Sequence, residues 1–146
     1  MRAHFTSTFG VTAKLMRGLN ISCGEFHADE KSGSAFERVC RDLPEISDTS
    51  RQEILAGFDE GEFTLIAPDV AIKLIPQLRE YRDLLVSEIG HSDFLREMNR
   101  EESVGICSVK LKWGEGRGWR LYCAVNLLAA CEHSAVSLEP VVVCLD

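Results

Sequence analysis

The segment that most constrains the fold is LYCAVNLLAACEHSAV at residues 121–136, which is apolar over nearly its whole length. Strands in globular proteins are usually about 3–10 residues long, so this span is too long for a typical strand. It predicts a largely buried helix over about 120–135. An alternative keeps its first residues extended, paired as a hairpin with SVKLKW through the intervening GEGR.

Strand-like segments flank this helix on both sides. VGICSVKLKW alternates and is rich in β-branched residues, so we expect a strand over 104–112. PVVVCL predicts a second strand near 140–145. A strand, a helix and a strand in succession form a crossover unit, in which a parallel pairing would be right-handed.

The region before residue 45 combines a polar connection with an amphipathic segment. HADEKSGSAF predicts a loop over 27–36, with Ser34 placed to cap the helix that follows. That helix is expected over 35–43, because its apolar residues recur at the spacing of one helical face, and Pro44 ends it.

Two further elements are expected between residues 49 and 67. A short helix over 50–58 has Thr49 or Ser50 as its cap. DEGE at 59–62 is a turn signal, and FTLIA after it is typical of a short buried strand.

Two prolines lie in the next helical segment. Pro68 suits a first helical turn, where its missing N–H costs nothing. Pro76 is expected to break or kink the continuation, which leaves two segments over 69–75 and 77–88 or one bent helix. The residues expected to share its buried face are Leu78, Tyr81, Leu85 and Ile89.

Three weaker signals complete the secondary structure, namely a short helix from Ser92 to about 99 and strands near 5–12 and 19–23. The chain of 146 residues is long enough for one sizeable core. We therefore predict the α+β class, as a single globular domain over 1–146 with several helices packed on a small mixed sheet.

Negative charge is concentrated in one part of the chain. The formal net charge is −7, and residues 25–69 carry twelve acids against four bases, a balance of −8. A field of this sign repels nucleic-acid phosphates and attracts a basic partner. The alternative is an ordinary solvated surface.

Cysteine usage and the N-terminus point to a cytoplasmic protein. MRAHFTSTFGVTAK lacks the apolar core of a signal peptide, and the longest uncharged apolar run, 121–131, falls short of the ~20 residues of a membrane span. Six cysteines are then expected to stay reduced. Those with apolar neighbours, which we expect in the core, are Cys107, Cys123, Cys131 and Cys144.

The stretch WGEGRGWRLYC at residues 113–123 raises the question of a phosphate-binding loop. Glycines between a strand and a helix are the right context for an anion, and Arg117 and Arg120 would add charge. The dinucleotide fingerprint nevertheless fails at Trp119, and no G-K-[ST] follows. A connection that needs positive φ is the favoured interpretation, with one of Trp113 and Trp119 buried and the other partly exposed.

Catalytic and metal-binding patterns are weak. Cys23 with His27, and Cys131 with His133, lack the spacing of zinc half-sites, so no metal or cofactor is expected. A thiol activated by His27 is conceivable, although a lone Cys23 is favoured. Without a G-x-S-x-G elbow or another catalytic constellation, we do not expect an enzyme.

The C-terminal pattern W-R-L-Y-x-x-x-x-L-L-x-A-C-E-x-S, followed by E-P-V-V-V, resembles the ends of a class of small bacterial proteins. These are the cytoplasmic immunity proteins of contact-dependent growth inhibition and related polymorphic toxin systems. The resemblance covers about 119–143. It implies a protein that binds a cognate toxin, and it assigns no binding residues.

Charge and resemblance together give a functional hypothesis, the stoichiometric neutralisation of a basic, nuclease-type toxin domain. The candidate toxin-binding acids lie in loop and turn signals and are Glu25, Asp29, Glu30, Asp59, Glu60 and Glu62. Two alternatives stay open. One is a phosphate or small-molecule binder, or an enzyme, that uses the 114–118 loop; the other is a non-catalytic scaffold with homo-oligomeric contacts.

Overall fold

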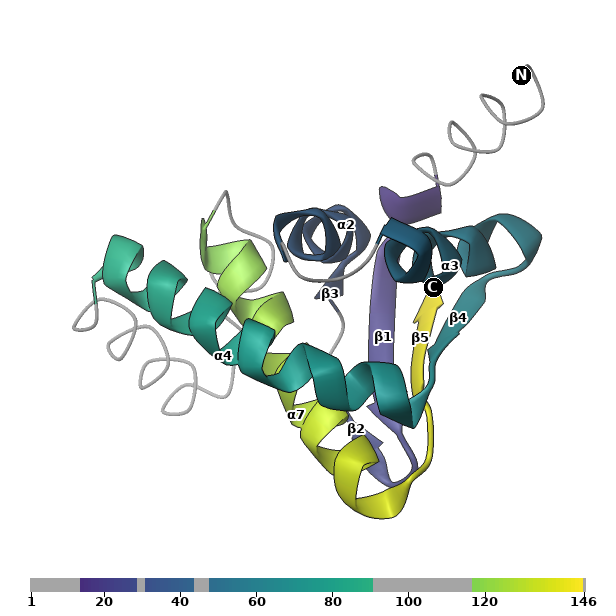
Figure 1. The fold of residues 1–146 in the computed structure, drawn as a ribbon. Coiled ribbons are helices and arrows are strands. Elements are labelled where there is room, and N and C mark those ends of the chain that lie inside the picture. Colours follow the sequence, from purple (N-terminus) through teal and green to yellow (C-terminus); the bar gives the residue numbers. More distant parts are fainter. Residues whose placement is uncertain (1–13, 29–30, 44–47, 91–116, 146) are drawn as a thin grey trace.

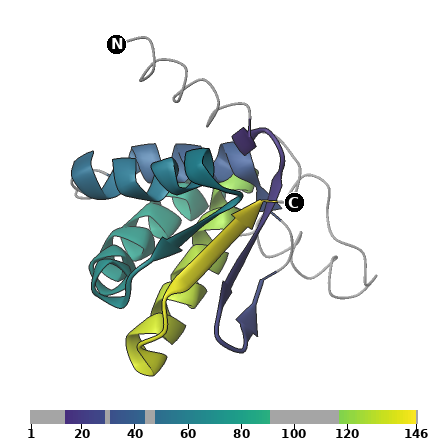
Figure 2. The same ribbon diagram turned by 90° about the vertical axis from the view of Figure 1, so that its right-hand side faces the viewer.

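The computed structural model describes residues 14–28, 31–43, 48–90 and 117–145. Helices and sheet form separate layers, with the helices gathered against one face of the sheet (Figures 1 and 2). The helices are α2 (Gly33–Asp42), α3 (Asp48–Glu60), α4 (Pro68–Ile89) and α7 (Arg117–Ser137). The strands are β1 (Gly18–Cys23), β2 (Phe26–His27), β3 (Lys31–Ser32), β4 (Phe63–Ile66) and β5 (Val141–Leu145). The predicted α+β class is confirmed.

The described strands all pair in antiparallel fashion. Their order is β2-β1-β5-β4, and β3 pairs with the start of β1. The C-terminal strand β5 therefore lies between β1 and β4, which come from the first half of the chain. A mixed sheet was predicted, and the described sheet is antiparallel instead. The parallel crossover would need the predicted strand over 104–112, which lies outside the described residues, as do the predicted strand near 5–12 and the helix from Ser92.

Helix α7 confirms the buried helix predicted over 120–135, so the alternative hairpin for its first residues is wrong. It packs along α4 and also contacts α2 and β1. Because neighbours surround it on several sides, its sequence is apolar nearly all round, as expected for a buried helix. Its side chains buried in the core include Leu121, Ala124, Leu127, Leu128 and Cys131.

The loop predicted over 27–36 is shorter than expected. β2 extends to His27, β3 follows at Lys31–Ser32, and α2 begins at Gly33. The cap is Ser32, whose hydroxyl accepts a hydrogen bond from the Ala35 N–H at 3.2 Å, so the assignment of Ser34 as cap was wrong. The Gly33 N–H donates to the Arg17 carbonyl oxygen at 2.9 Å, and this tertiary contact fixes where the helix starts.

Helix α3 is longer than predicted at both ends. It begins at Asp48, so Thr49 and Ser50 lie inside it rather than capping it, and it continues through Asp59 and Glu60, which were assigned to a turn. Lys14 explains the C-terminal extension. Its ammonium group donates to the carbonyl oxygens of Phe58 at 2.6 Å and Gly61 at 3.2 Å, which satisfies acceptors at the helix end.

Helix α4 starts at Pro68, as predicted, and continues through Pro76 as one helix. The predicted face is confirmed, with Leu78, Tyr81 and Leu85 buried. Pro76 itself is exposed. Tertiary packing of the apolar face therefore holds the helix together across a residue that lacks a backbone donor.

One hydrophobic cluster joins residues from all the described helices and from β1, β4 and β5. Cys123 and Cys131 belong to it, as predicted, whereas Cys144 is exposed, which corrects the expectation for that residue, and Cys107 lies outside the described residues. Trp119 is partly buried against the cluster. Among the described helices, none is both long and apolar enough to cross a membrane.

Candidate functional site

The face of the sheet that points away from the helices carries a second set of side chains. Strand alternation places Leu19, Ile21, Val141 and Val143 in the core, and their sequence neighbours on the other side. In the described part of the chain no helix covers this side, which faces the viewer in Figure 2. We name it the open face and define it by Asn20, Ser22, Phe63, Leu65, Val142 and Cys144.

Strand register arranges the open face in two rows. Asn20 and Phe63 both pair with Cys144, and Ser22 and Leu65 both pair with Val142. The β1 side of the face is therefore polar and the β4 side apolar. Directly paired side chains on one face lie about 4.5–5.5 Å apart at Cβ, so each row is continuous.

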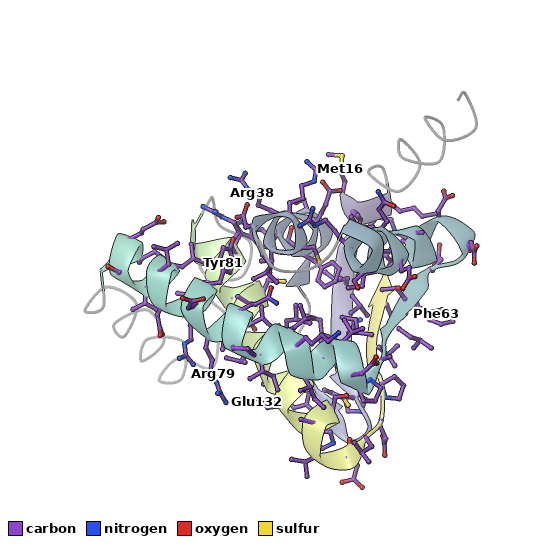
Figure 3. All side chains as sticks on the ribbon, in the orientation of Figure 1. Met16, Arg38, Phe63, Arg79, Tyr81 and Glu132 are labelled. Atoms are coloured by element: carbon purple, nitrogen blue, oxygen red, sulfur yellow. The ribbon has the colours of Figure 1, made fainter. Side chains whose placement is uncertain are left out.

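Strand β4 contributes the most exposed apolar groups of this face. Phe63 and Leu65 are each 52% exposed, whereas Thr64 and Ile66 between and after them are buried. In Figure 3, Phe63 points away from the helices. Large apolar side chains that adjoin on an otherwise folded surface mark a candidate interaction site.

An acidic turn borders the apolar end of the open face. We define it by Asp59, Glu60 and Glu62, which lie at the end of α3 and immediately before β4. Glu62 accepts two hydrogen bonds from the Arg17 guanidinium, at 3.0 and 3.3 Å, and these bonds lower the pKa of Glu62. Glu60 is exposed. The turn thus presents negative charge beside Phe63, with Glu62 already paired.

The structure separates the remaining candidate acids from this turn. Glu25 is exposed in the β1–β2 turn. Since Leu19 pairs with Leu145 and Ser22 with Val142, Glu25 follows the end of β1 that lies far from Phe63. Asp29 and Glu30 lie outside the described residues. Of the six predicted acids, the acidic turn alone adjoins the apolar part of the open face within the described structure.

A polar cluster joins three helices on the opposite side of the molecule. Asp42 on α2 accepts from the Tyr81 hydroxyl of α4 at 2.6 Å and from the Arg120 guanidinium of α7 at 3.1 Å. Arg38 donates to its other oxygen at 3.0 Å. Arg38 and Tyr81 are labelled in Figure 3. Burial by itself would raise the pKa of Asp42, but these hydrogen bonds outweigh it and lower the pKa.

This cluster bears on the phosphate-loop alternative. Arg120, one of its two proposed cations, is already paired with Asp42. Arg117 and Gly118 belong to the first turn of α7 rather than to a loop. Among the described glycines, positive φ occurs at Gly24 and Gly90, so Gly118 in α7 does not supply the positive φ expected for this connection. Residues 113–116, including Trp113, lie outside the described part.

The proposed thiol pair is also separated. Cys23 pairs with Phe26, and Ser22 pairs with His27, so Cys23 and His27 point to opposite faces of the sheet. The Cys23 thiol donates to the Glu139 carbonyl oxygen at 3.4 Å. Within the described ranges, no three His, Cys, Asp or Glu side chains are grouped as a metal site.

Sequence reasoning missed the open face, because no local pattern in FTLI marks which face of the strand is uncovered. FTLIA is predicted as a short buried strand, whereas Phe63 and Leu65 of β4 are exposed and Thr64 and Ile66 are buried. Only the position of β4 at the sheet edge, with helices on one side, exposes Phe63 and Leu65.

Comparison of this chain with protein families, with curated proteins and with solved structures finds no match.

Proposed function

We propose that this protein acts by binding rather than by catalysis, as an immunity protein that neutralises a basic toxin domain. The single observation that carries the proposal is the pair of half-exposed apolar side chains, Phe63 and Leu65, beside the acidic turn. Protein interfaces combine an apolar, well-packed centre with a polar rim. The apolar half of the open face and the acidic turn have this arrangement.

Phe63 is the strongest candidate for an energetic anchor. Binding energy concentrates in a few large side chains near the centre of an interface, and the surrounding contacts mainly exclude water. Phe63 lies between the acidic turn and Leu65 along the chain, and it pairs across the sheet with the exposed Cys144. A partner that covers Phe63 therefore also contacts both neighbouring groups.

The charge distribution supports a basic partner. The net charge of the chain is −7, and the acidic turn belongs to the segment that holds most of it. Complementary fields raise association rates and depend on ionic strength. A toxin domain that binds nucleic acid must itself be basic, because it has to hold phosphates.

The primary experiment is the purification of the tagged chain from its native cells at low and at high salt. We expect a basic protein to co-purify in stoichiometric amount at low salt, and high salt to weaken its binding. Expression of that protein alone should arrest growth, and co-expression of this chain should restore it. Recovery of this chain alone, or of a partner whose toxicity it leaves unchanged, contradicts the proposal.

Two matched pairs of variants test the assigned surface. Phe63→Ser should weaken partner binding at least tenfold, as for a hot-spot residue. Val136→Ser is its control, because Val136 is 87% exposed on α7, away from the open face. Equal affinities of the two variants would exclude Phe63 from the interface.

The second pair addresses the acids. Glu60→Lys and Glu25→Lys change the net charge equally, but Glu60 ends α3 three residues before Phe63, whereas Glu25 follows the end of β1 that lies far from Phe63. Glu60→Lys should lower the association rate several-fold more than Glu25→Lys and reduce its salt dependence. Equal effects would mean that the whole-molecule charge, and not the acidic turn, guides association.

A further inference from the structure

Strand β4 is an edge strand with one described partner. The strand order ends at β4, whose neighbour is β5. An edge strand presents backbone donors and acceptors to which another extended segment can pair. The pairing register shows which residues of β4 present these backbone donors and acceptors.

The Leu145 N–H donates to the Glu62 carbonyl oxygen at 2.7 Å, so these residues face each other as a hydrogen-bonded pair. In an antiparallel ladder bonded and non-bonded pairs alternate. Thr64 and Ile66, which pair with Val143 and Val141, therefore direct their backbone groups toward β5. Phe63 and Leu65 direct their N–H and C=O groups away from it.

The same two residues thus offer backbone groups at the edge and apolar side chains on the open face. An added strand could form up to four backbone hydrogen bonds with Phe63 and Leu65. Its alternate side chains would extend the two rows of the open face beside them. Exposure of 52% at both side chains shows that this surface is accessible in the described structure.

The charged residues around β4 indicate which kind of partner could add a strand to its edge. Exposed carboxylates stand near both ends of β4, Glu60 before it and Asp69 after it. The nearby cations Lys14 and Arg17 are engaged within the chain, Lys14 with carbonyl oxygens of α3 and Arg17 with Glu62. A second copy of this chain would bring another net charge of −7, which opposes self-association.

We infer that the basic partner binds by adding an extended strand to the edge of β4 that has no partner strand among the described residues. Apolar residues of the added strand would lie beside Phe63 and Leu65, and Lys or Arg near Glu60 and Asp69. This inference rests on the proposed function and specifies how the partner is held. It predicts that the backbone of β4, and not only its side chains, contributes to affinity.

The test uses the complex purified from native cells and compares two substitutions at one position. Leu65→Ala and Leu65→Pro both remove the leucine side chain, but only Leu65→Pro removes the outward N–H. Proline is tolerated on an edge strand where its N–H side faces solvent. We expect Leu65→Pro to weaken binding at least tenfold beyond Leu65→Ala, with both variants still folded by circular dichroism.

Amide hydrogen exchange of the unmodified complex gives an answer that does not depend on the folding of a variant. Strand addition should slow exchange of the Phe63 and Leu65 amides at least tenfold, whereas the Thr64 and Ile66 amides are already protected by β5 in the free chain.

The outcomes separate the two proposals. A bound basic toxin that leaves the Phe63 and Leu65 amides unprotected overturns strand addition and leaves the proposed function intact. Protection of these amides in a dimer of this chain assigns the edge to a second copy and overturns the inference. Recovery of the chain with no basic partner overturns both proposals.

Discussion

At the scale of single residues, Leu138 holds an unusual backbone conformation. It follows the last residue of α7 with φ of 62°, and its N–H donates to the Ser134 carbonyl oxygen at 2.8 Å. This left-handed position after a helix is usually occupied by glycine, because a side chain there costs about 1–2 kcal/mol. The Leu138 side chain is 69% exposed, so its burial offsets little of that cost.

Leu138→Gly should therefore raise the free energy of unfolding by up to about 1 kcal/mol, after the greater chain entropy of glycine is subtracted. Urea denaturation measures the change. Val136→Gly is the matched control, because Val136 is also exposed but lies within α7. There glycine should lower the free energy of unfolding by about 0.5 kcal/mol. A loss of stability in both variants would contradict the strain at Leu138.

The described cysteines differ sharply in access to solvent. Cys23, Cys40, Cys123 and Cys131 are buried, whereas Cys144 is exposed on the open face. Burial raises the pKa of Cys131 to about 12 and raises that of Cys40 strongly as well, which suppresses the reactive thiolate.

We expect a thiol reagent to modify Cys144 within the time of mixing, and the four buried thiols only at the rate of unfolding. Peptide mass spectrometry after a short pulse identifies the modified residue. Cys144→Ser should remove the fast modification among these five residues. Bound partner should also slow it, since Cys144 pairs with Phe63. Rapid labelling of Cys131 would show that the core opens more readily than its burial implies.

At the scale of elements, the docking of α3 on β4 depends on a glycine. A Cβ added to Gly57 would lie 2.6 Å from Thr64 Cβ, closer than such atoms approach, and 3.0 Å from Thr64 Cα. Gly57 therefore lets the helix lie directly against the strand. This contact also positions the acidic turn, because Asp59 and Glu60 are the last two residues of α3.

Gly57→Ala should lower the free energy of unfolding by about 1–2 kcal/mol, because overpacking exceeds the gain in helix propensity. Gly61→Ala is its control, since a Cβ there meets nothing within 4 Å. The control should be neutral or slightly stabilising. Thermal or urea unfolding of both variants measures the difference, and equal stabilities would mean that α3 can shift away from β4 without cost.

Element prediction succeeded where local signals agreed with burial. The apolar length of 121–136, the first-turn Pro68 and the valine run before residue 145 each specified one element, and each is present. It failed where a distant residue decided the boundary. Lys14 extends α3 past the expected turn, and the contact of Gly33 with Arg17 shifts the start of α2. Neither partner is near in sequence.

At the scale of the whole molecule, Asp42 ties together three helices from different parts of the chain. Its carboxylate receives bonds from Tyr81 on α4 and Arg120 on α7, and Arg38 lies one turn before it on α2. Because the pKa of Asp42 is lowered in the folded state, its ionised form stabilises the fold above the unfolded pKa of about 3.9. That contribution is lost as the pH falls through the lower, folded value.

Asp42→Asn should lower the free energy of unfolding by about 1–3 kcal/mol at neutral pH, since it weakens hydrogen bonds to a charged group. The difference in the free energy of unfolding between variant and wild type should narrow as the pH falls below about 4. Asp83→Asn is the control, because Asp83 forms an exposed pair with Arg82 that should contribute less than about 1 kcal/mol. If the difference in unfolding free energy between Asp42→Asn and wild type stayed constant with pH, the stabilising role assigned to the Asp42 charge would be contradicted.

The sequence by itself determined the α+β class, the buried helix α7, the strands β1, β4 and β5 and the concentration of acids, because these depend on local composition and periodicity. Tertiary structure decided the strand order, the pairing of Arg120 with Asp42, and which acids adjoin an apolar surface. Such features depend on residues far apart in the chain, such as Glu62 with Arg17 and Phe63 with Cys144. Exposure of Phe63 and Leu65 follows from the position of β4 at the edge of a sheet covered by helices on one face, and no local pattern encodes that position.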